Sequence, residues 1–95
     1  MEKIDKMKQN PNLSPKGKEQ KTDLKTLVLL NDDFNTFDHV IDCLISICAH
    51  NPIQAEQCAV LTHYKGSCVV KIGEIEDLLS FQNDLEIYNL DAAII

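Results

Sequence analysis

Hydrophobic residues recur every three or four positions between residues 37 and 50, which is the spacing of one face of an α-helix. The apolar positions of this stripe are Phe37, Val40, Ile41, Leu44, Ile47 and Cys48. Asn35 is the expected N-cap, because its side chain can accept a hydrogen bond from a free backbone N–H, and Asp38 places an acid in the first turn. The pattern predicts an amphipathic helix that ends near His50.

A second helix is predicted to begin directly afterwards. Asn51-Pro52-Ile53-Gln54 places an N-cap residue before a proline at the first helical position, with a glutamine where a capping box requires one. Gly66 is a natural stop, because glycine readily adopts the left-handed conformation that ends helices. The helix is therefore expected to run to about Tyr64. Its predicted core face consists of Ile53, Val60, Leu61 and Tyr64.

Three shorter segments have the features of β-strands. Residues 26–30 and 67–72 are rich in β-branched residues and Leu, and residues 85–90 alternate between apolar and polar positions. Residues 74–82 are predicted to form a short helix with an acidic start. The resulting order, β-α-α-β-α-β, predicts an α+β fold, a two-layer sandwich in which helices cover a three-stranded sheet.

The segment before residue 23 differs in composition from the rest of the chain. Residues 1–22 contain Pro, Gly, Asn, Ser and Lys without sustained periodicity, which is typical of a flexible tail. They hold six lysines and three acidic residues, whereas residues 23–95 hold three lysines and twelve acidic residues. We therefore predict a basic N-terminal tail over 1–22 and an acidic domain over 23–95.

Charge and hydropathy argue against several classes of function. The 95-residue chain has a formal net charge of −6 and no arginine, so it lacks the clustered cations that contact nucleic-acid phosphates. An acidic domain is better suited to a cationic ligand. No apolar run approaches the ~20 residues that span a bilayer, and the start, MEKIDKMKQN, lacks the apolar stretch of a secretory signal. We expect a cytoplasmic protein that binds neither nucleic acid nor membrane.

The cysteines and histidines could in principle form a metal site. The four cysteines, Cys43, Cys48, Cys58 and Cys68, lie in apolar segments without a CxxC pair, so we predict reduced, buried thiols. His39 with Cys43 is the nearest zinc candidate, but it lacks a second pair of ligands. The residues that follow Asp33 do not complete a calcium loop, and hydrolase and P-loop motifs are missing. We expect no metal, no cofactor and no catalytic activity.

Two polar motifs remain as candidates for recognition. The acceptor-rich sequence NDD at 31–33 ends the first predicted strand, although Asn and Asp also favour turns for purely structural reasons. His63 lies near the end of the second predicted helix, beside Thr62 and one turn from Ala59. These small neighbours could form one wall of a shallow pocket. Alternatively, His63 is simply a residue whose charge suits a helix C-terminus.

These motifs carry a resemblance to a known family. The stretch LVLLNDDFNTFDHVIDCLISI and the later AVLTHYKGSCVV resemble the ClpS adaptor family. The hallmarks of that family are a strand that ends in NDD plus an aromatic residue, here residues 31–34, and an H-Y-x-G at the end of the second helix, here residues 63–66. The resemblance covers residues 26–72 well and residues 73–95 loosely.

The resemblance implies a function as an adaptor. ClpS proteins bind the free amino end of substrates that begin with a bulky apolar residue, known as N-degrons, and deliver them to a hexameric Clp unfoldase–protease through the N-terminal domain of the unfoldase. It implies that Asn31, Asp32 and His63 hold the α-amino group of the ligand, while Asp33 supports the nearby backbone. It further implies a monomer whose tail takes part in delivery. The alternatives are a diverged interaction module that does not read amino ends, and a metal-assisted hydrolase that uses Asp32, Asp33 and His63.

Physical chemistry is consistent with the implied roles. An α-ammonium offers three N–H donors and one positive charge, whereas an Asn carbonyl, a carboxylate and a neutral imidazole offer three acceptors and one compensating charge. A blocked amine would leave some of these acceptors unpaired, which costs about 1–3 kcal/mol for each buried group. The imidazole must be neutral to accept a hydrogen bond, so capture should weaken in acid.

The sequence departs from the family at several positions of the expected site. Asn35-Thr36 replaces the usual Thr-Pro, Phe37 stands where Met is common, and Ala59 replaces a Met that gates the pocket in many members. We expect the smaller Ala59 to allow branched first residues, offset in part by the bulk of Phe37. The complete expected substrate-binding set is Asn31, Asp32, Asp33, His63, Asn35, Phe37, Ala59 and Thr62.

The C-terminal third of the chain is the weakest part of the resemblance. The segment between His63 and Leu90 is about ten residues shorter than in typical members, so the third helix, which contributes to unfoldase contact in the family, is expected to be short. Glu86 or Ile87 is expected to occupy the place of a pocket-lining leucine.

Overall fold

A three-stranded antiparallel sheet organises the computed structural model, which describes residues 23–95. Strand β2 (Lys25–Leu30) lies between β3 (Ser67–Gly73) and β4 (Asp91–Ile94), and the helices are α1 (Phe37–Cys48), α2 (Pro52–Lys65) and α3 (Ile75–Ile87). The predicted α+β class and the order β-α-α-β-α-β are therefore confirmed. The predicted tail, residues 1–22, lies outside the described residues.

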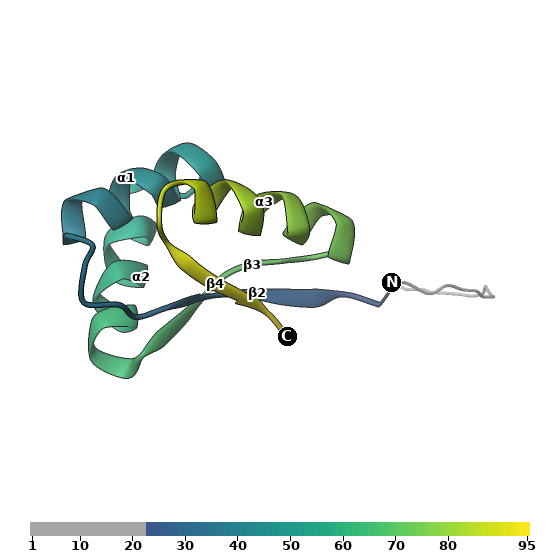
Figure 1. The fold of residues 1–95 in the computed structure, drawn as a ribbon, viewed down its shortest axis with the longest axis horizontal. Coiled ribbons are helices and arrows are strands. Elements are labelled where there is room, and N and C mark those ends of the chain that lie inside the picture. Colours follow the sequence, from purple (N-terminus) through teal and green to yellow (C-terminus); the bar gives the residue numbers. More distant parts are fainter. Residues whose placement is uncertain (1–22) are drawn as a thin grey trace, which may run out of the picture.

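The hydrophobic core lies between the sheet and the helices. In Figure 1, α1 and α3 lie above the strands, and α2 lies at the end of the sheet where β2 leaves it. Leu27 and Leu29 of the central strand are buried against Leu44 of α1 and against Leu78 and Leu85 of α3. The central position of β2 explains why its middle residues are almost inaccessible to solvent, since strands and helices surround them.

Helix α1 begins one residue later than the sequence predicts. Thr36, not Asn35, is the N-cap, and its hydroxyl oxygen accepts a hydrogen bond from the backbone N–H of His39 at 3.1 Å. The helix ends at Cys48 because Ala49 adopts a left-handed conformation with φ of 59°. The backbone N–H of His50 then bonds back to Leu44 at 3.1 Å, so His50 lies outside the helix.

Helix α2 begins and ends as expected. The side chain of Asn51 accepts a hydrogen bond from the backbone N–H of Gln54 at 2.8 Å, and Pro52 occupies the first helical position. At the other end, Gly66 has φ of 93°, a conformation that is strained for other residues. The cap at Asn51 and the stop at Gly66 are confirmed.

The predicted core face of α2 is wrong. The expected members Ile53, Val60, Leu61 and Tyr64 are all exposed. The buried face instead carries small side chains, namely Ala55, Cys58, Ala59 and Thr62. These positions also follow helical spacing, and their small volume lets the helix lie close to β3 and α1. The size of the apolar side chains alone predicts that the opposite face of α2 is the buried one.

The last predicted strand is also wrong. Residues 85–87 belong to α3, whose buried residues Leu78 and Leu85 are two helical turns apart. A turn follows, in which Asn89 has a left-handed φ of 67°, and the strand β4 begins only at Asp91. The apparent alternation in this segment therefore came from the end of an amphipathic helix.

Burial of the cysteines was predicted for all four and is found for three. Cys43, Cys48 and Cys58 are buried free thiols, whereas Cys68 is only half-buried. Burial raises the pKa of Cys48 to about 11, so its thiolate is scarce at neutral pH. None of the helices within residues 23–95 is both long enough and apolar enough to cross a membrane.

Candidate functional site

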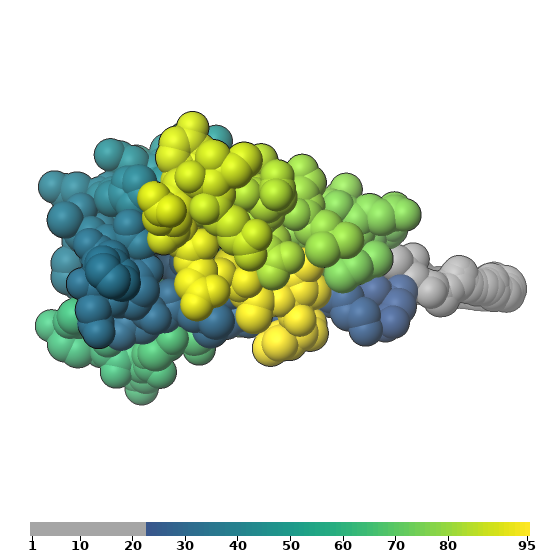
Figure 2. All heavy atoms as spheres, viewed as in Figure 1, coloured from purple at the N-terminus to yellow at the C-terminus, as the bar shows by residue number. Residues whose placement is uncertain are grey.

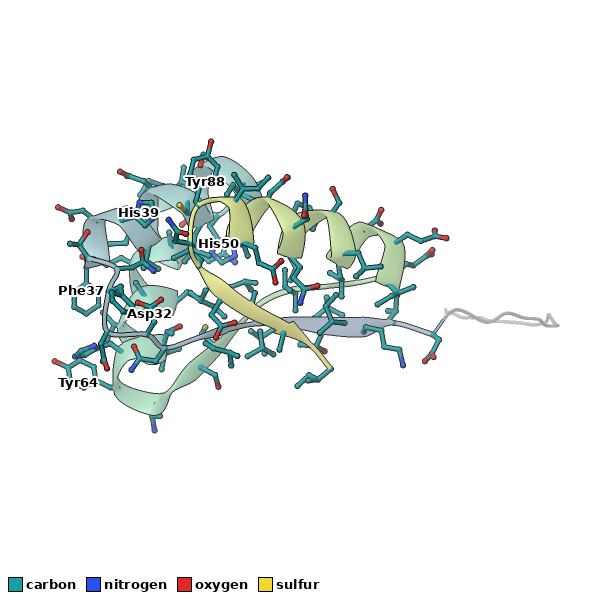
Figure 3. The ribbon with its side chains drawn as sticks, viewed as in Figure 1. Asp32, Phe37, His39, His50, Tyr64 and Tyr88 are labelled. Carbon is teal, nitrogen blue, oxygen red and sulfur yellow. The ribbon has the colours of Figure 1, made fainter. Side chains whose placement is uncertain are left out.

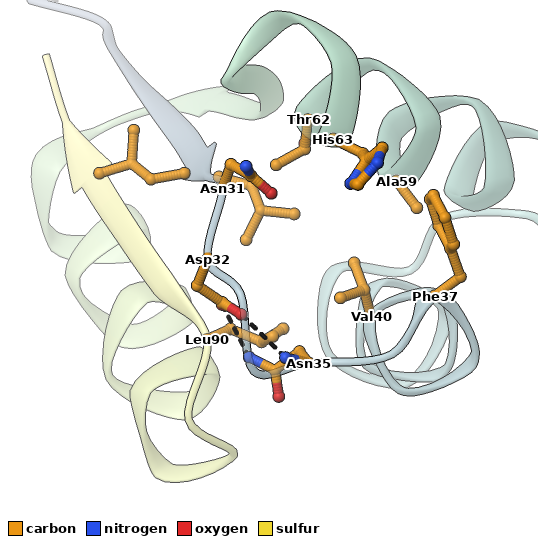
Figure 4. A pocket seen from close by; sticks show the side chains of 11 residues that line it. Asn31, Asp32, Asn35, Phe37, Val40, Ala59, Thr62, His63 and Leu90 are labelled. Atoms are coloured by element: carbon orange, nitrogen blue, oxygen red, sulfur yellow. Dashed lines mark hydrogen bonds between the residues drawn. The ribbon is translucent and has the colours of Figure 1, made fainter.

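A small cavity of about 50 Å³ lies where β2 ends, between the loop before α1, the inner face of α2 and the start of β4 (Figure 4). This cavity is called the pocket below. It is lined by Leu29, Leu30, Asn31, Asp32, Asn35, Phe37, Val40, Ala59, Thr62, His63 and Leu90. The structure thus gathers seven of the expected substrate-binding residues around one cavity and leaves Asp33 outside it.

A backbone hydrogen bond brings the two polar motifs together. The N–H of Asn31, directly after β2, donates to the carbonyl of Gly66 at 3.0 Å. Gly66 is the C-cap of α2, three residues after His63, so the end of the strand is held beside the end of the helix. Asn31 and His63 therefore face the same space from two different elements (Figure 4).

Asn31 and His63 present hydrogen-bonding atoms that the rest of the domain leaves free. Neither side chain makes a hydrogen bond to any other residue within 23–95. The imidazole of His63 is held instead by edge contacts with two rings, Phe37 at 5.3 Å and Tyr64 at 4.8 Å between centroids. An amide oxygen and an imidazole nitrogen are thus available as acceptors at the rim of the pocket.

The carboxylate of Asp32 organises the loop that follows β2. Its Oδ1 accepts hydrogen bonds from the backbone N–H groups of Phe34 at 2.9 Å and Asn35 at 2.8 Å, and its Oδ2 accepts one from the Asn35 side chain at 2.7 Å. Partial burial would raise the pKa of Asp32, but these hydrogen bonds and the nearby His39 outweigh it and hold the pKa below its ordinary value. Asp32 is therefore an anion at neutral pH.

The backbone support that was expected of Asp33 is provided by Asp32. Asp33 is exposed, lies outside the pocket and makes no hydrogen bond to residues 23–95. The sequence does not separate the two roles, because both carboxylates follow the same strand and either could bond to the next backbone amides.

Asn35 has a different task from the N-cap role that the sequence suggested. Its side-chain nitrogen donates both to Oδ2 of Asp32 at 2.7 Å and to the carbonyl of Asn89 at 2.8 Å. These two bonds use both amide hydrogens, so none remains for a ligand. Asn35 lines the pocket, but its two amide hydrogens join Asp32 to the turn at Asn89.

The remaining walls of the pocket are apolar. Leu29, Leu30, Val40 and Leu90 line it together with the buried Ala59 and Thr62. The Thr62 hydroxyl donates to the carbonyl of Cys58 at 2.8 Å, so its hydrogen is already committed. The expectation that Glu86 or Ile87 occupies the place of a pocket-lining leucine is wrong, since both are exposed on α3, and Leu90 lines the pocket instead. Leu90 was missed because the end of α3 was mistaken for a strand.

Metal ligands do not gather in the part of the chain that the structure describes. His39 and Cys43 approach to 3.7 Å between Nε2 and Sγ, and Nε2 also lies 2.8 Å from the carbonyl of Tyr88. Within residues 23–95 there is no group of three or more His, Cys, Asp or Glu residues that could hold a metal ion.

A family model for the ATP-dependent Clp protease adaptor protein ClpS matches residues 20–90. The chain belongs to the ClpS family. This confirms the resemblance inferred from the two motifs, and the description as an adaptor agrees with the expectation of a non-catalytic protein.

Individual ClpS relatives support the family assignment. The chain is 33% identical over 60 residues to the ATP-dependent Clp protease adapter protein ClpS of Thermosynechococcus vestitus, covering 62% of this chain and 64% of that protein. It is 39% identical over 51 residues to the protein of the same name from Nostoc sp., covering 53% of each. The match thus spans between half and two thirds of the length of these curated relatives.

The fold is that of ClpS proteins of known structure. The structure of Agrobacterium tumefaciens ClpS2 bound to L-phenylalaninamide superposes with a TM-score of 0.73, at 18% sequence identity, and the similarity covers 79% of this chain and 98% of that one. The sheet and its three helices are therefore those of the ClpS fold.

The geometry of the loop predicts a specific role for Asp32 in stability. Replacing Asp32 by Ala removes three hydrogen bonds to a charged acceptor at a partly exposed position, so we expect the free energy of unfolding near pH 7 to fall by about 1–2 kcal/mol. Because the pKa of Asp32 is lowered by folding, this contribution is present above the unfolded value of ~3.9 and is lost as the pH falls through the folded value. Chemical denaturation at neutral pH and near pH 3 measures it.

Asp33→Ala is the matched control, because it removes the same charge one residue away without removing a hydrogen bond within 23–95. It should change the stability by less than about 0.5 kcal/mol. Equal effects of the two substitutions would contradict the assignment of the loop to Asp32.

Proposed function

We propose that this ClpS-family chain is an N-degron adaptor: it binds the free α-amino group and the bulky apolar first residue of a protein and delivers that protein to a Clp unfoldase–protease. The observation that carries the proposal is the placement of Asn31, Asp32 and His63 around one pocket whose other walls include Leu29, Leu30, Val40 and Leu90. The proposed capture is non-covalent, and no catalytic step or cofactor is part of it.

The rim is suited to an ammonium group. Asn31 and His63 offer free acceptors, and Asp32, with its lowered pKa, supplies a negative charge at neutral pH. Together these three residues supply three acceptors, one of which, the carboxylate of Asp32, is also the anion. They match the three N–H donors and the single positive charge of an α-ammonium. The excess of acidic residues over 23–95 adds a long-range attraction for a cation.

The interior of the pocket is suited to an apolar side chain. Its walls are made by leucines and Val40, and the buried hydroxyl of Thr62 is already bonded to its own helix. Burying a Leu or Phe side chain is favourable by roughly 1.5–3 kcal/mol. In support, the similar structure of Agrobacterium tumefaciens ClpS2 holds L-phenylalaninamide, which combines a free α-amino group with an apolar side chain.

Delivery is the second half of the proposal. The curated relatives are named as adapters of the ATP-dependent Clp protease, so we propose that the partner is the N-terminal domain of a hexameric Clp unfoldase. We further propose that residues 1–22 act in delivery. Residues 23–95 act in capture as a monomer, with Asn31, Asp32 and His63 holding the amino group and Phe37, Ala59 and Thr62 lining the pocket for the first side chain.

A diverged interaction module is the second candidate. The observation in its favour is the apolar surface outside the pocket, where Phe34 is 95% exposed, Tyr64 77% and Ile53 69%. Such a surface can hold a partner protein without any contact to an amino end.

Acetylation separates the two candidates. We expect a peptide that begins with Leu to bind with a free amino end and to bind at least about tenfold more weakly when that end is acetylated, because the blocked group leaves acceptors unpaired. Fluorescence titration of the two peptides measures this. Equal affinities would favour the interaction module over the adaptor.

Acid should weaken capture. An imidazolium cannot accept a hydrogen bond and repels an ammonium, so a proton on the imidazole of His63 removes one acceptor and adds a like charge. We expect the affinity for a Leu-starting peptide to fall as the pH is lowered from about 8 to about 5.5, and the His63→Gln variant to lack this loss in acid because an amide does not take up a proton there. A flat profile of the unchanged protein would remove His63 from the acceptor set.

The size of Ala59 should set the tolerance for branched first residues. We expect peptides that begin with Ile or Val to bind better than those that begin with Ala, and Ala59→Met to reduce their binding because Ala59 lines the pocket from its buried helix face. Leu61→Met places the same side chain on the exposed face of α2 and should have little effect. Binding of Ile- and Val-peptides no better than that of Ala-peptides would refute the idea.

A further inference from the structure

The side chain of Asn35 joins two sides of the pocket that are distant in sequence. Its amide nitrogen donates to Oδ2 of Asp32, which belongs to the polar rim, and to the carbonyl of Asn89 at 2.8 Å. Asn89 directly precedes Leu90, which forms part of the apolar wall. In the space-filling view, the yellow segment after α3 lies against the blue segment that leads into α1 (Figure 2).

The turn between α3 and β4 presents its carbonyl groups to this loop. The N–H groups of Tyr88, Asn89 and Leu90 are all bonded to carbonyls of the last turn of α3, at 3.0–3.1 Å. The carbonyl groups of the turn therefore point toward the loop before α1. The carbonyl of Asn89 accepts from Asn35, and that of Tyr88 lies 2.8 Å from Nε2 of His39. Figure 3 labels His39 and Tyr88 in the same part of the molecule. Two parallel contacts thus tie the turn to the start of α1.

We propose that Asn35 is a positioning residue that fixes the distance between Asp32 and Leu90, so that recognition of the amino group and recognition of the first side chain depend on each other. This inference rests on the proposed function of the pocket. Asn35 itself has no free amide hydrogen for a ligand, so it acts through the two residues that it holds.

The Asn35→Asp variant distinguishes a positioning role of Asn35 from a general effect of negative charge on binding. Asn35→Asp keeps the shape of the side chain but removes both donors, and its carboxylate repels Asp32 and the carbonyl of Asn89. The added negative charge near the rim would strengthen binding of a cation if charge alone mattered. If Asn35 instead positions Asp32 and Leu90, the same substitution weakens binding.

The test is a titration of the full chain with two peptides that differ only in beginning with Leu or with Ala. In Asn35→Asp we expect the affinity for the Leu-peptide to fall by about tenfold, and the preference for Leu over Ala to shrink, because Leu90 is no longer held in place. Asn83→Asp is the matched control, since it adds the same charge on the exposed surface of α3 and should leave the affinity within about twofold.

Two results would overturn the inference. Unchanged or tighter binding would show that Asn35 positions nothing, and an equal loss for both peptides would show that it acts on Asp32 alone. A thermal melt confirms that each variant is folded; if Asn35→Asp is not, Asn35→Ser, which is too short to span both partners, replaces it in the same titration.

A second measurement does not depend on any ligand. The methyl resonances of Leu90 in the free protein should shift in Asn35→Asp and stay in place in Asn83→Asp, and unmoved Leu90 methyls would also overturn the inference. If the unchanged protein binds neither peptide, the proposed function fails, while these resonances still decide whether Asn35 positions Leu90.

Discussion

The candidate site depends on the hydrogen bond that joins the end of β2 to the end of α2. The N–H of Asn31 donates to the carbonyl of Gly66, and this bond holds two motifs side by side that are more than thirty residues apart in the chain. Gly66 can take this place because it adopts a left-handed conformation that turns the chain sharply from the helix into β3. The rim of the pocket is thus a consequence of how a helix ends and a strand begins.

Neighbouring polar residues of the loop after β2 have different roles, which only the three-dimensional structure distinguishes. Asp32 uses its carboxylate both to shape the loop and to keep a negative charge at the rim, while Asp33 next to it faces solvent. Asn35 then connects this loop to the turn before β4. Polar and apolar parts of the pocket are therefore supported by the same few hydrogen bonds, as pre-organised binding sites require.

The parts of the fold that local chemistry determines were predictable from the sequence. The cap at Asn51, the stop at Gly66 and the order of the elements follow from single side chains and from periodicity, and the motifs at 31–34 and 63–66 indicated the family. The buried face of α2 was not predictable in the same way, because the close approach of a helix to its neighbours selects small residues over bulky ones. For similar reasons Leu90 was missed, since its place in the wall depends on a left-handed turn at Asn89, and Asn35 was assigned a local role although its partner lies 54 residues away.

The small buried face of α2 has a counterpart on the outside of the molecule. Because the bulky residues of this helix point outward, Tyr64 is exposed, and Phe37, which contacts the same His63 ring, is also exposed beside the pocket. Figure 3 shows Phe37 and Tyr64 at the same end of the molecule. For a ligand of the proposed kind, brief contacts with these rings would keep the apolar first residue close to the pocket. They would also reduce the number of orientations that this residue must sample before it enters. Exposed aromatic side chains thus lie at one end of an otherwise acidic domain, and for the proposed ligand this end is where first contact with an apolar residue is favoured.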